Sequence, residues 1–417
     1  MKKRNNKHEK RVKRLIVGCG LCAIILSVST YAWFIGMKTV NVSSFDVSIA
    51  AIDSLSLSLN GTTWSDTVAI NSTNYSTAGY EGNTNSWGGD GLIPMSSVGK
   101  INTTSSRMTL FEKGSLTTSP GGYRLMASEV QNSGASEANG YVAFDLFIKN
   151  LSGNAYYTDL TPKNEEAIYL TPESTVTVAS DGGEAGTGIE NSVRVAFAQI
   201  GRVIATTTDT SIITGITCTT NSNVTGICAD RDAQIWEPND TKHVQNAINW
   251  YNTSCQKRTG ADVTQSASYS GTFGTCGTVE NGTAYNTYAV SGVINYTDNV
   301  DVYDGADYNN YEGSIASEAA TGKLVAYPYF TDTMKDKEGT ERPELITLAP
   351  NSITKVRVYI YIEGQDVDNY DFASLGKKIS VAFGFTKERF YGEDINYDNS
   401  GAPSLPENVD KRPTPSA

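Results

Sequence analysis

The chain has 417 residues, of which 19% are charged, and its formal net charge is −12. The first 14 residues hold eight Lys or Arg and one Glu, so 25 basic and 44 acidic residues remain in the other 403. Nucleic-acid binding needs clustered basic side chains, and we therefore expect no nucleic-acid partner. The two histidines, His8 and His243, are too few for sites built from several imidazoles.

An uncharged segment, residues 15–37, follows this basic stretch. As a membrane-spanning helix it is long enough to cross a bilayer, with the basic flank inside. As a secretory signal it ends in the small residues Thr30 and Ala32, with cleavage before Trp33. Both interpretations make residues 1–32 a signal peptide or membrane anchor. The rest of the chain is then extracellular or on the cell surface, membrane-anchored through residues 15–37 if the signal is not cleaved.

Alternating apolar residues recur along the following chain and are separated by clusters of Gly, Asn, Ser and Asp. This pattern predicts half-buried β-strands bounded by turns. The clearest runs lie at 45–49, 55–59, 141–150, 193–197, 356–362 and 379–385. No helix of twelve residues or more is expected after the leader. We predict an all-β fold, an antiparallel jelly-roll-like sandwich over residues 44–395.

Two long polar stretches interrupt these strands, at about 60–140 and 205–345. Structureless loops of this length are unusual, so we interpret both as insertions between core strands. The second holds all four cysteines beyond the leader and is a candidate disulfide-stapled subdomain. Residues 396–417 contain four prolines and few apolar residues, which predicts a disordered tail.

Cysteine usage fits an exported protein. Cys19 and Cys22 lie in the apolar leader, and four cysteines remain: Cys218, Cys228, Cys255 and Cys276. An even number in an exported chain indicates two disulfides, with three pairings open. Sequential pairing, Cys218–Cys228 and Cys255–Cys276, closes the shortest loops and is favoured. The spacings match no zinc-ligand signature.

The acidic segment Glu363–Asn369 follows a clear strand and offers Glu363, Asp366 and Asp368 as candidate ligands for a hard cation such as Ca²⁺. A cluster of aspartates at 298–307 has the same composition. The competing interpretation of both is a solvated acidic loop. No other cofactor is expected.

Catalytic signatures are missing from the sequence. His243 is the one histidine beyond the leader, and it lies in neither an HExxH motif nor the context of a Gly-x-Ser-x-Gly elbow. Trp236, Glu237 and His243 either line a site or belong to a packed tryptophan followed by a short helix, capped by Asn239 or Asp240. We favour the packed tryptophan and expect no enzyme.

The segment Ser29-Thr30-Tyr31-Ala32-Trp33-Phe34 resembles the signal-cleavage region of the TasA/camelysin family of exported Gram-positive matrix-fibre proteins. The strands at 45–59, 141–150, 355–364 and 379–386 are also similar to such a jelly roll. The resemblance implies cleavage after Ala32 and biofilm-matrix fibres in which each subunit donates an N-terminal strand to the next. The cysteines, the length and the insertions depart from that family.

Cleavage before Trp33 would leave an apolar-rich arm, residues 33–43. Its candidate donor-strand residues are Trp33, Phe34, Ile35, Met37, Val40 and Val42. Such an arm satisfies its backbone by adding to an open sheet edge, or it forms the first strand of its own sandwich, or it links the body to an uncleaved anchor.

The sequence thus predicts an exported structural protein that associates with itself or with other surface and matrix proteins. The alternative is a membrane-anchored adhesin that binds glycans through tyrosine-rich loops, because the chain has 23 tyrosines.

Overall fold

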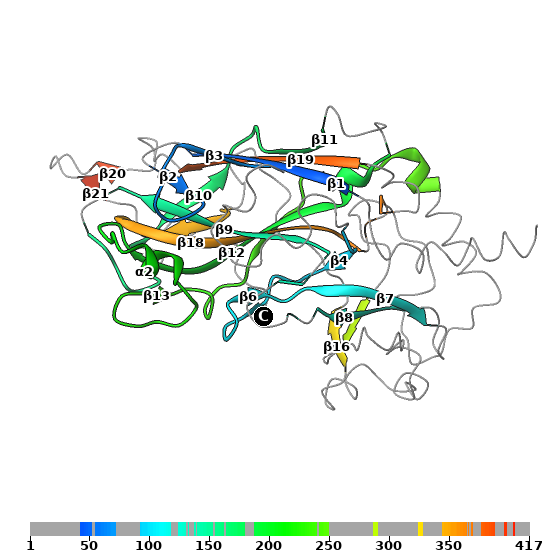
Figure 1. The fold of residues 1–417 in the computed structure, drawn as a ribbon, viewed down its shortest axis with the longest axis horizontal. Coiled ribbons are helices and arrows are strands. Elements are labelled where there is room, and N and C mark those ends of the chain that lie inside the picture. The colour runs from blue at the N-terminus through cyan, green and yellow to red at the C-terminus, as the bar shows by residue number, and fades with distance from the viewer. Residues whose placement is uncertain are drawn as a thin grey trace, which may run out of the picture.

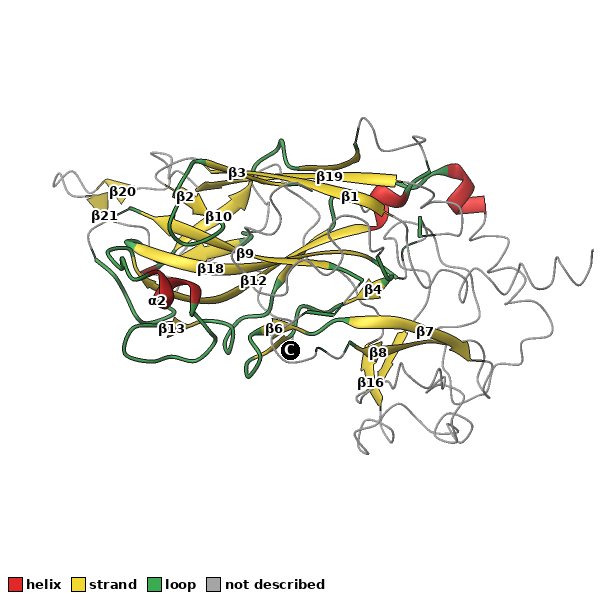
Figure 2. Cartoon of the chain, in the orientation of Figure 1, coloured by secondary structure: helices red, strands yellow, loops and turns green. Residues whose placement is uncertain are grey.

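The computed structural model describes residues 42–51, 55–71, 92–117, 124–130, 132, 137–138, 140–152, 155–161, 164–179, 187–239, 242–249, 287–290, 324–327, 344–364, 366, 368–369, 377–387, 396–397 and 403–404. Within them the protein is mostly β-structure, with two large sheets that are largely antiparallel and few short helices (Figure 1; Figure 2). The all-β expectation is confirmed at this level. No helix among the described residues is both long and apolar enough to span a membrane.

The first large sheet has the order β17-β10-β19-β1-β3, with β11 also paired to β19. Its strands are β1 (Val42–Ala51), β3 (Thr67–Ile70), β10 (Glu166–Leu170), β11 (Thr175–Val178), β17 (Ile346–Leu348) and β19 (Lys377–Lys387). β1 and β19 run parallel, from the Val42–Lys377 pair to the Ala51–Phe385 pair. The other pairings in this sheet are antiparallel.

The second large sheet has the order β13-β12-β18-β9-β2, with β14 also paired to β12. Its strands are β2 (Leu55–Ser58), β9 (Val142–Asn150), β12 (Val193–Ile204), β13 (Thr225–Gly226), β14 (Gln234–Trp236) and β18 (Ser352–Ile362). Every pairing in it is antiparallel.

The main core lies between these two sheets, which Figure 1 shows stacked as layers. Alternate residues of each strand fill it, because side chains one apart on a strand point to opposite faces. Phe197 of β12, for example, packs edge-on against Phe383 of β19 with ring centroids 5.1 Å apart. The apolar positions that the sequence alternation marked in β9, β12, β18 and β19 all belong to this core.

The opposite face of the second sheet is buried as well, which the expectation of half-buried strands did not include. All eleven residues of β18 are buried. Residues around the β5–β6 hairpin, β5 (Ile101–Asn102) and β6 (Arg107–Met108), cover this face together with 205–235 and helix α2 (Thr210–Thr214). Both stretches were expected to be insertions, and their described parts supply the second core.

A third sheet and smaller elements complete the described structure. The sheet has the order β16-β15-β8-β7-β4. Its strands are β4 (Met95–Ser96), β7 (Phe111–Thr117), β8 (Arg124–Glu129), β15 (Thr287–Val290) and β16 (Leu324–Tyr327). A 3-10 helix, η3 (Ile189–Ser192), precedes β12. Within the stretch expected to be a disordered tail, β20 (Asn396–Tyr397) pairs with β21 (Pro403–Ser404).

The two ends of the sandwich are identified by the strands that begin or finish there. β1 and β19 begin together, with Val42 opposite Lys377. β19 finishes at Lys387, whose Nζ lies 3.4 Å from Oδ1 of Asn150 at the end of β9. Eleven residues of strand span about 35 Å, so Val42 and Asn150 lie at opposite ends. We call the end at Val42 and Lys377 the arm end, and the end at Asn150 the patch end.

Candidate functional site

Two segments that the sequence marked separately meet at the arm end. β18 runs from the patch end, where Ser352 pairs with Asn150, and the acidic loop follows it at Glu363. The segment from Trp236 to the helical turn at 245–249 reaches the same place. The loop is not solvated: Asp366 is 3% exposed and Asp368 is fully buried. The interpretation as a solvated acidic loop is therefore wrong for the acidic residues Glu363, Asp366 and Asp368.

His243 and Asp368 form the centre of this site. Nδ1 of His243 lies 2.6 Å from Oδ2 of Asp368, and the backbone N–H of Val244 donates to Oδ1 at 3.0 Å. The backbone N–H of Asp368 in turn donates to Oδ1 of Asp366 at 2.8 Å. Ligand atoms of His243, Asp366 and Asp368 all lie within 4.8 Å of one another. These side chains form a compact set of one imidazole and two carboxylates.

Arg194 on β12 supplies a positive charge beside them. Its Nη2 donates to Oδ2 of Asp366 at 2.8 Å, and its Nε lies 3.6 Å from Oε1 of Glu237. Its Nη1 donates to the carbonyl of Asn191 at 2.8 Å. The guanidinium is 1% exposed, so these pairs are desolvated and replacing one partner would strand a buried charge.

Burial dominates the electrostatics of Asp366. Burial, and after it the neighbouring charge of Asp368, raise the pKa of that carboxyl, and the net result of all its neighbours is a pKa of about 6 against the ordinary 3.8. The Arg194 guanidinium and His243 pull it down. The raised pKa therefore reflects mainly the removal of this carboxyl from water, which disfavours its charged form.

The structure places the sequence candidates in different roles. Asp366 and Asp368 belong to the three-residue set, whereas the side chain of Glu363 accepts a hydrogen bond from Ser96 on β4. Trp236 is fully buried in the main core, as the packed-tryptophan interpretation expected. Asn239 does not cap a helix: its amide donates to the carbonyls of Val176 and Glu190. Arg194 carried no sequence signal.

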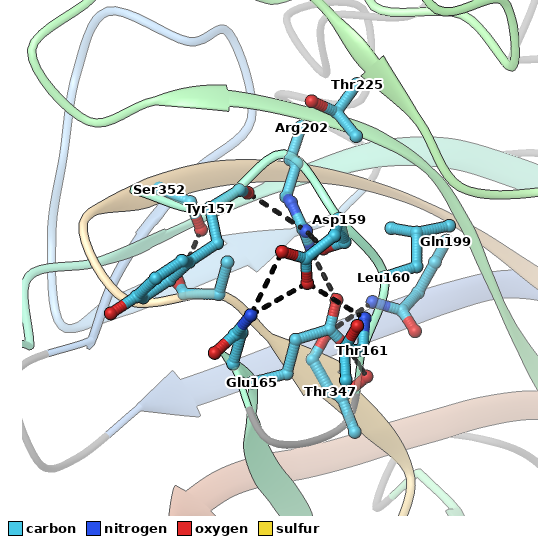
Figure 3. A network of polar contacts seen from close by, with 12 residues as sticks. Tyr157, Asp159, Leu160, Thr161, Glu165, Gln199, Arg202, Thr225, Thr347 and Ser352 are labelled. Carbon is cyan, nitrogen blue, oxygen red and sulfur yellow. Dashed lines mark hydrogen bonds and ion pairs between the residues drawn. The ribbon is translucent and has the colours of Figure 1, made fainter. Parts of the chain in front are cut away.

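A second polar network joins the two large sheets at the patch end (Figure 3). Arg202 of β12 forms an ion pair with Glu165, whose other oxygen lies 2.6 Å from Nη2 of Arg231. The Thr347 hydroxyl on β17 donates to the same oxygen of Glu165. Gln199 donates to the Thr347 carbonyl at 2.7 Å. This network holds residues 157–160 and Glu165 against both sheets.

Among the described residues, three large apolar side chains are exposed at this end: Leu151, Tyr157 and Ile204, at 54%, 38% and 37%. Leu151 directly follows β9, and Ile204 at the end of β12 pairs with Ser352, which also pairs with Asn150. The Tyr157 carbonyl accepts a hydrogen bond from Nη2 of Arg202 at 3.1 Å. We call these three residues the apolar patch.

The remaining candidates divide between described and undescribed residues. Cys218 and Cys228 form a disulfide with Cα atoms 5.3 Å apart, which confirms the first of the sequential pairs. Val42 is the first residue of β1. Thr30, Ala32, Trp33, Phe34, Ile35, Met37, Val40, Cys255, Cys276 and the aspartates at 298–307 lie outside the described residues.

Comparisons with known proteins identify no relative. No family model, curated protein or solved structure matches the chain.

Proposed function

We propose that this protein is an exported structural subunit of the cell surface or extracellular matrix, with a jelly-roll-like sandwich, that assembles end to end through its N-terminal arm. The leader and the TasA/camelysin-like hexapeptide at Ser29–Phe34 support export and cleavage before Trp33. The subunit's partners are then further copies of itself or other matrix proteins. The observation that carries the proposal is the position of the apolar patch at the end opposite Val42.

Opposite ends matter because a head-to-tail contact joins two different surfaces, and where its rotation does not close a ring it repeats into a filament. The arm enters β1 at the arm end, where Val42 pairs with Lys377 of its own chain. We therefore take residues 33–41 as the part available for donation. The patch that a second copy would cover lies at the other end, so each subunit offers one donor and one acceptor.

An edge strand for the arm is present on the first sheet. β3 pairs with Val47–Ala50 of β1, and no described strand pairs with its other edge. Nine extended residues span about 30 Å, more than the roughly 13 Å of a four-residue strand. Strand addition at such an edge satisfies backbone hydrogen bonds and buries alternate side chains. We propose β3 as the acceptor edge and the apolar patch as the adjoining contact.

The best-formed polar site supports a structural role more than a catalytic one. Nε2 of His243 is buried, and Asp366 and Asp368 are buried as well. A general base must reach its substrate's proton within hydrogen-bond distance, and the burial of these atoms in the described fold opposes such a contact with a polymer. We therefore propose that the protein is not an enzyme.

Electron microscopy of the exported full-length protein tests assembly. We expect filaments from the mature protein and monomers from a variant that lacks residues 33–41. A variant that lacks residues 409–417 is the matched control, because it loses nine residues at the other terminus and should still form filaments. Filaments that persist without the arm would refute donation. Dose-dependent binding of a persistently monomeric protein to a glycan array would instead favour the adhesin alternative.

A further inference from the structure

We infer that His243, Asp366 and Asp368 form a binding site for one divalent transition-metal ion, with Zn²⁺ as the expected occupant. This site is independent of the proposed assembly. It would tie together two segments that lie more than 120 residues apart, the 236–249 segment and the loop that follows β18. Among the described residues, these three side chains are the one group of three or more His, Cys, Asp or Glu that lie close enough together to hold a metal ion.

The distances suit a small cation. Ligand atoms on one ion with bonds of about 2.0–2.2 Å lie within roughly 4.5 Å of one another. Those of the three side chains lie within 4.8 Å, so a shift of about 0.3 Å would bring them all into that range. Nδ1 of His243 and Oδ2 of Asp368 are 2.6 Å apart. Tetrahedral zinc ligands are about 3.3 Å apart. The distance between these two atoms would therefore have to grow by under about 1 Å for both to bind one ion.

The two carboxylates retain acceptor capacity. Asp366 accepts hydrogen bonds from Arg194 and from the N–H of Asp368, and Asp368 accepts one from Val244 and contacts His243. An ionised carboxylate has about four lone-pair sites, so each has lone pairs left for a metal.

An unsatisfied amide oxygen in the same loop points independently to a ligand. Asn369 is 5% exposed, and its Oδ1 is buried without a hydrogen-bond partner. Its N–H donates to the Asp366 carbonyl at 3.1 Å, and its Nδ2 faces the Gly364 carbonyl at 3.5 Å, so the side chain is held against the loop that carries both aspartates. Buried polar atoms without partners are rare, and a bound cation would satisfy this oxygen.

The ligand types favour zinc over calcium. Ca²⁺ takes six to eight oxygen ligands, whereas this buried set includes an imidazole, and Glu363 is engaged with Ser96. Imidazole with few carboxylates suits Zn²⁺, which is commonly four-coordinate. Asn369 Oδ1, on the loop that carries both aspartates, is our candidate for the fourth ligand. Tight packing would hold the set in place, because a Cβ added to Gly188 would lie 2.6 Å from Oδ1 of Asp368.

Metal titration of the exported full-length protein tests this inference. The protein is stripped with a chelator and titrated with ZnCl₂, MnCl₂ or CaCl₂ in separate calorimetric experiments. We expect one equivalent of Zn²⁺ to bind, and the melting temperature to rise by several degrees when the ion is restored. Absence of stoichiometric zinc binding, or stoichiometric binding of Ca²⁺ alone, would overturn the inference.

Variants locate the ion. His243→Gln and Asp368→Asn should each lower zinc affinity at least tenfold. Asp232→Asn is the matched control, since it removes a carboxylate outside the site, in an exposed ion pair with Lys100, and should leave one equivalent of zinc bound to the folded protein. Unchanged zinc affinity in folded His243→Gln would contradict the assignment. If the site variants fail to fold, the titration of the unaltered protein still decides whether the site exists.

Discussion

Arg357 on β18 and Asp145 on β9 lie directly opposite each other in the strand pairing and form a two-pronged ion pair, with Nε 2.8 Å from Oδ1 and Nη2 3.2 Å from Oδ2. Lys355 adds a second cation, its Nζ 3.0 Å from Oδ2. Arg357 also donates to the Ser106 carbonyl, and Lys355 to the Thr214 carbonyl. The ion cluster therefore links the second sheet to both segments that cover its outer face.

Removing Asp145 should destabilise the protein strongly. Asp145→Ala leaves two buried cations without their shared anion, and the loss of one partner of a buried pair costs about 3–5 kcal/mol. The free energy of unfolding from urea titration is the measurement. Asp232→Ala is the control, because its pair with Lys100 is exposed and such pairs contribute about 0–1 kcal/mol. Equal losses in the two variants would contradict the account.

The same cluster predicts a dependence of stability on acid. Burial by itself would raise the pKa of Asp145, but the charges and hydrogen bonds of Arg357 and Lys355 outweigh it and hold the pKa below its ordinary 3.8. A carboxyl whose pKa is lower in the folded state adds stability above its unfolded pKa, and this stability disappears as the pH falls through the folded pKa.

We therefore expect the stability difference between the unaltered protein and Asp145→Asn to shrink as the pH is lowered from about 5 to 3. Urea titrations at fixed ionic strength measure it. A difference that stays constant across this range would show that Asp145 does not titrate with a lowered pKa.

The disulfide should stabilise the cover of the second sheet. Cys218 and Cys228 are both buried in the second core, and a bridge that closes a short loop stabilises by roughly 2–4 kcal/mol. Changing both to Ser should lower the free energy of unfolding by that amount. Changing Cys255 and Cys276 to Ser serves as the comparison. If reductant lowers the stability of the unaltered protein but no longer does so in that double variant, the structural role assigned to Cys218–Cys228 is wrong.

The apolar patch should matter for assembly and not for folding. Leu151→Ser combined with Ile204→Ser should abolish filaments, because the acceptor end loses its apolar contact. Substitutions at exposed positions usually change the free energy of unfolding by no more than about 0.5 kcal/mol. The melting temperature of the monomer should therefore stay nearly unchanged. Thr206→Ser, an exposed neighbour, is the control for sedimentation analysis. Normal filaments from the double variant would exclude the patch from the interface.

Much of the fold could be predicted from the sequence, since alternation is a local signal. Val356, Val358 and Ile360 were assigned to one face of a strand, and they lie in the core between the sheets. The Cys218–Cys228 pair followed from short loop length. The buried Trp236 followed from its size and context.

The second core could not be predicted because its cause is not local. Lys355 and Arg357 alternate with apolar residues, a pattern that normally indicates a solvated face. Only the long-range packing of residues 101–108 and 210–216 buries them, and Asp145 neutralises them across the sheet. His243 and Asp368 likewise meet across 125 residues, and the parallel pairing of β1 with β19 carries no sequence signature.

End-to-end assembly is tested most directly by photocrosslinking from the arm. A photoreactive amino acid replaces Phe34 in a mixture of isotopically light and heavy chains, and mass spectrometry maps the products in assembled material. The account predicts crosslinks between light and heavy chains, from position 34 to peptides that contain Thr67–Ile70, Leu151 or Ile204. Crosslinks confined to single chains would contradict it.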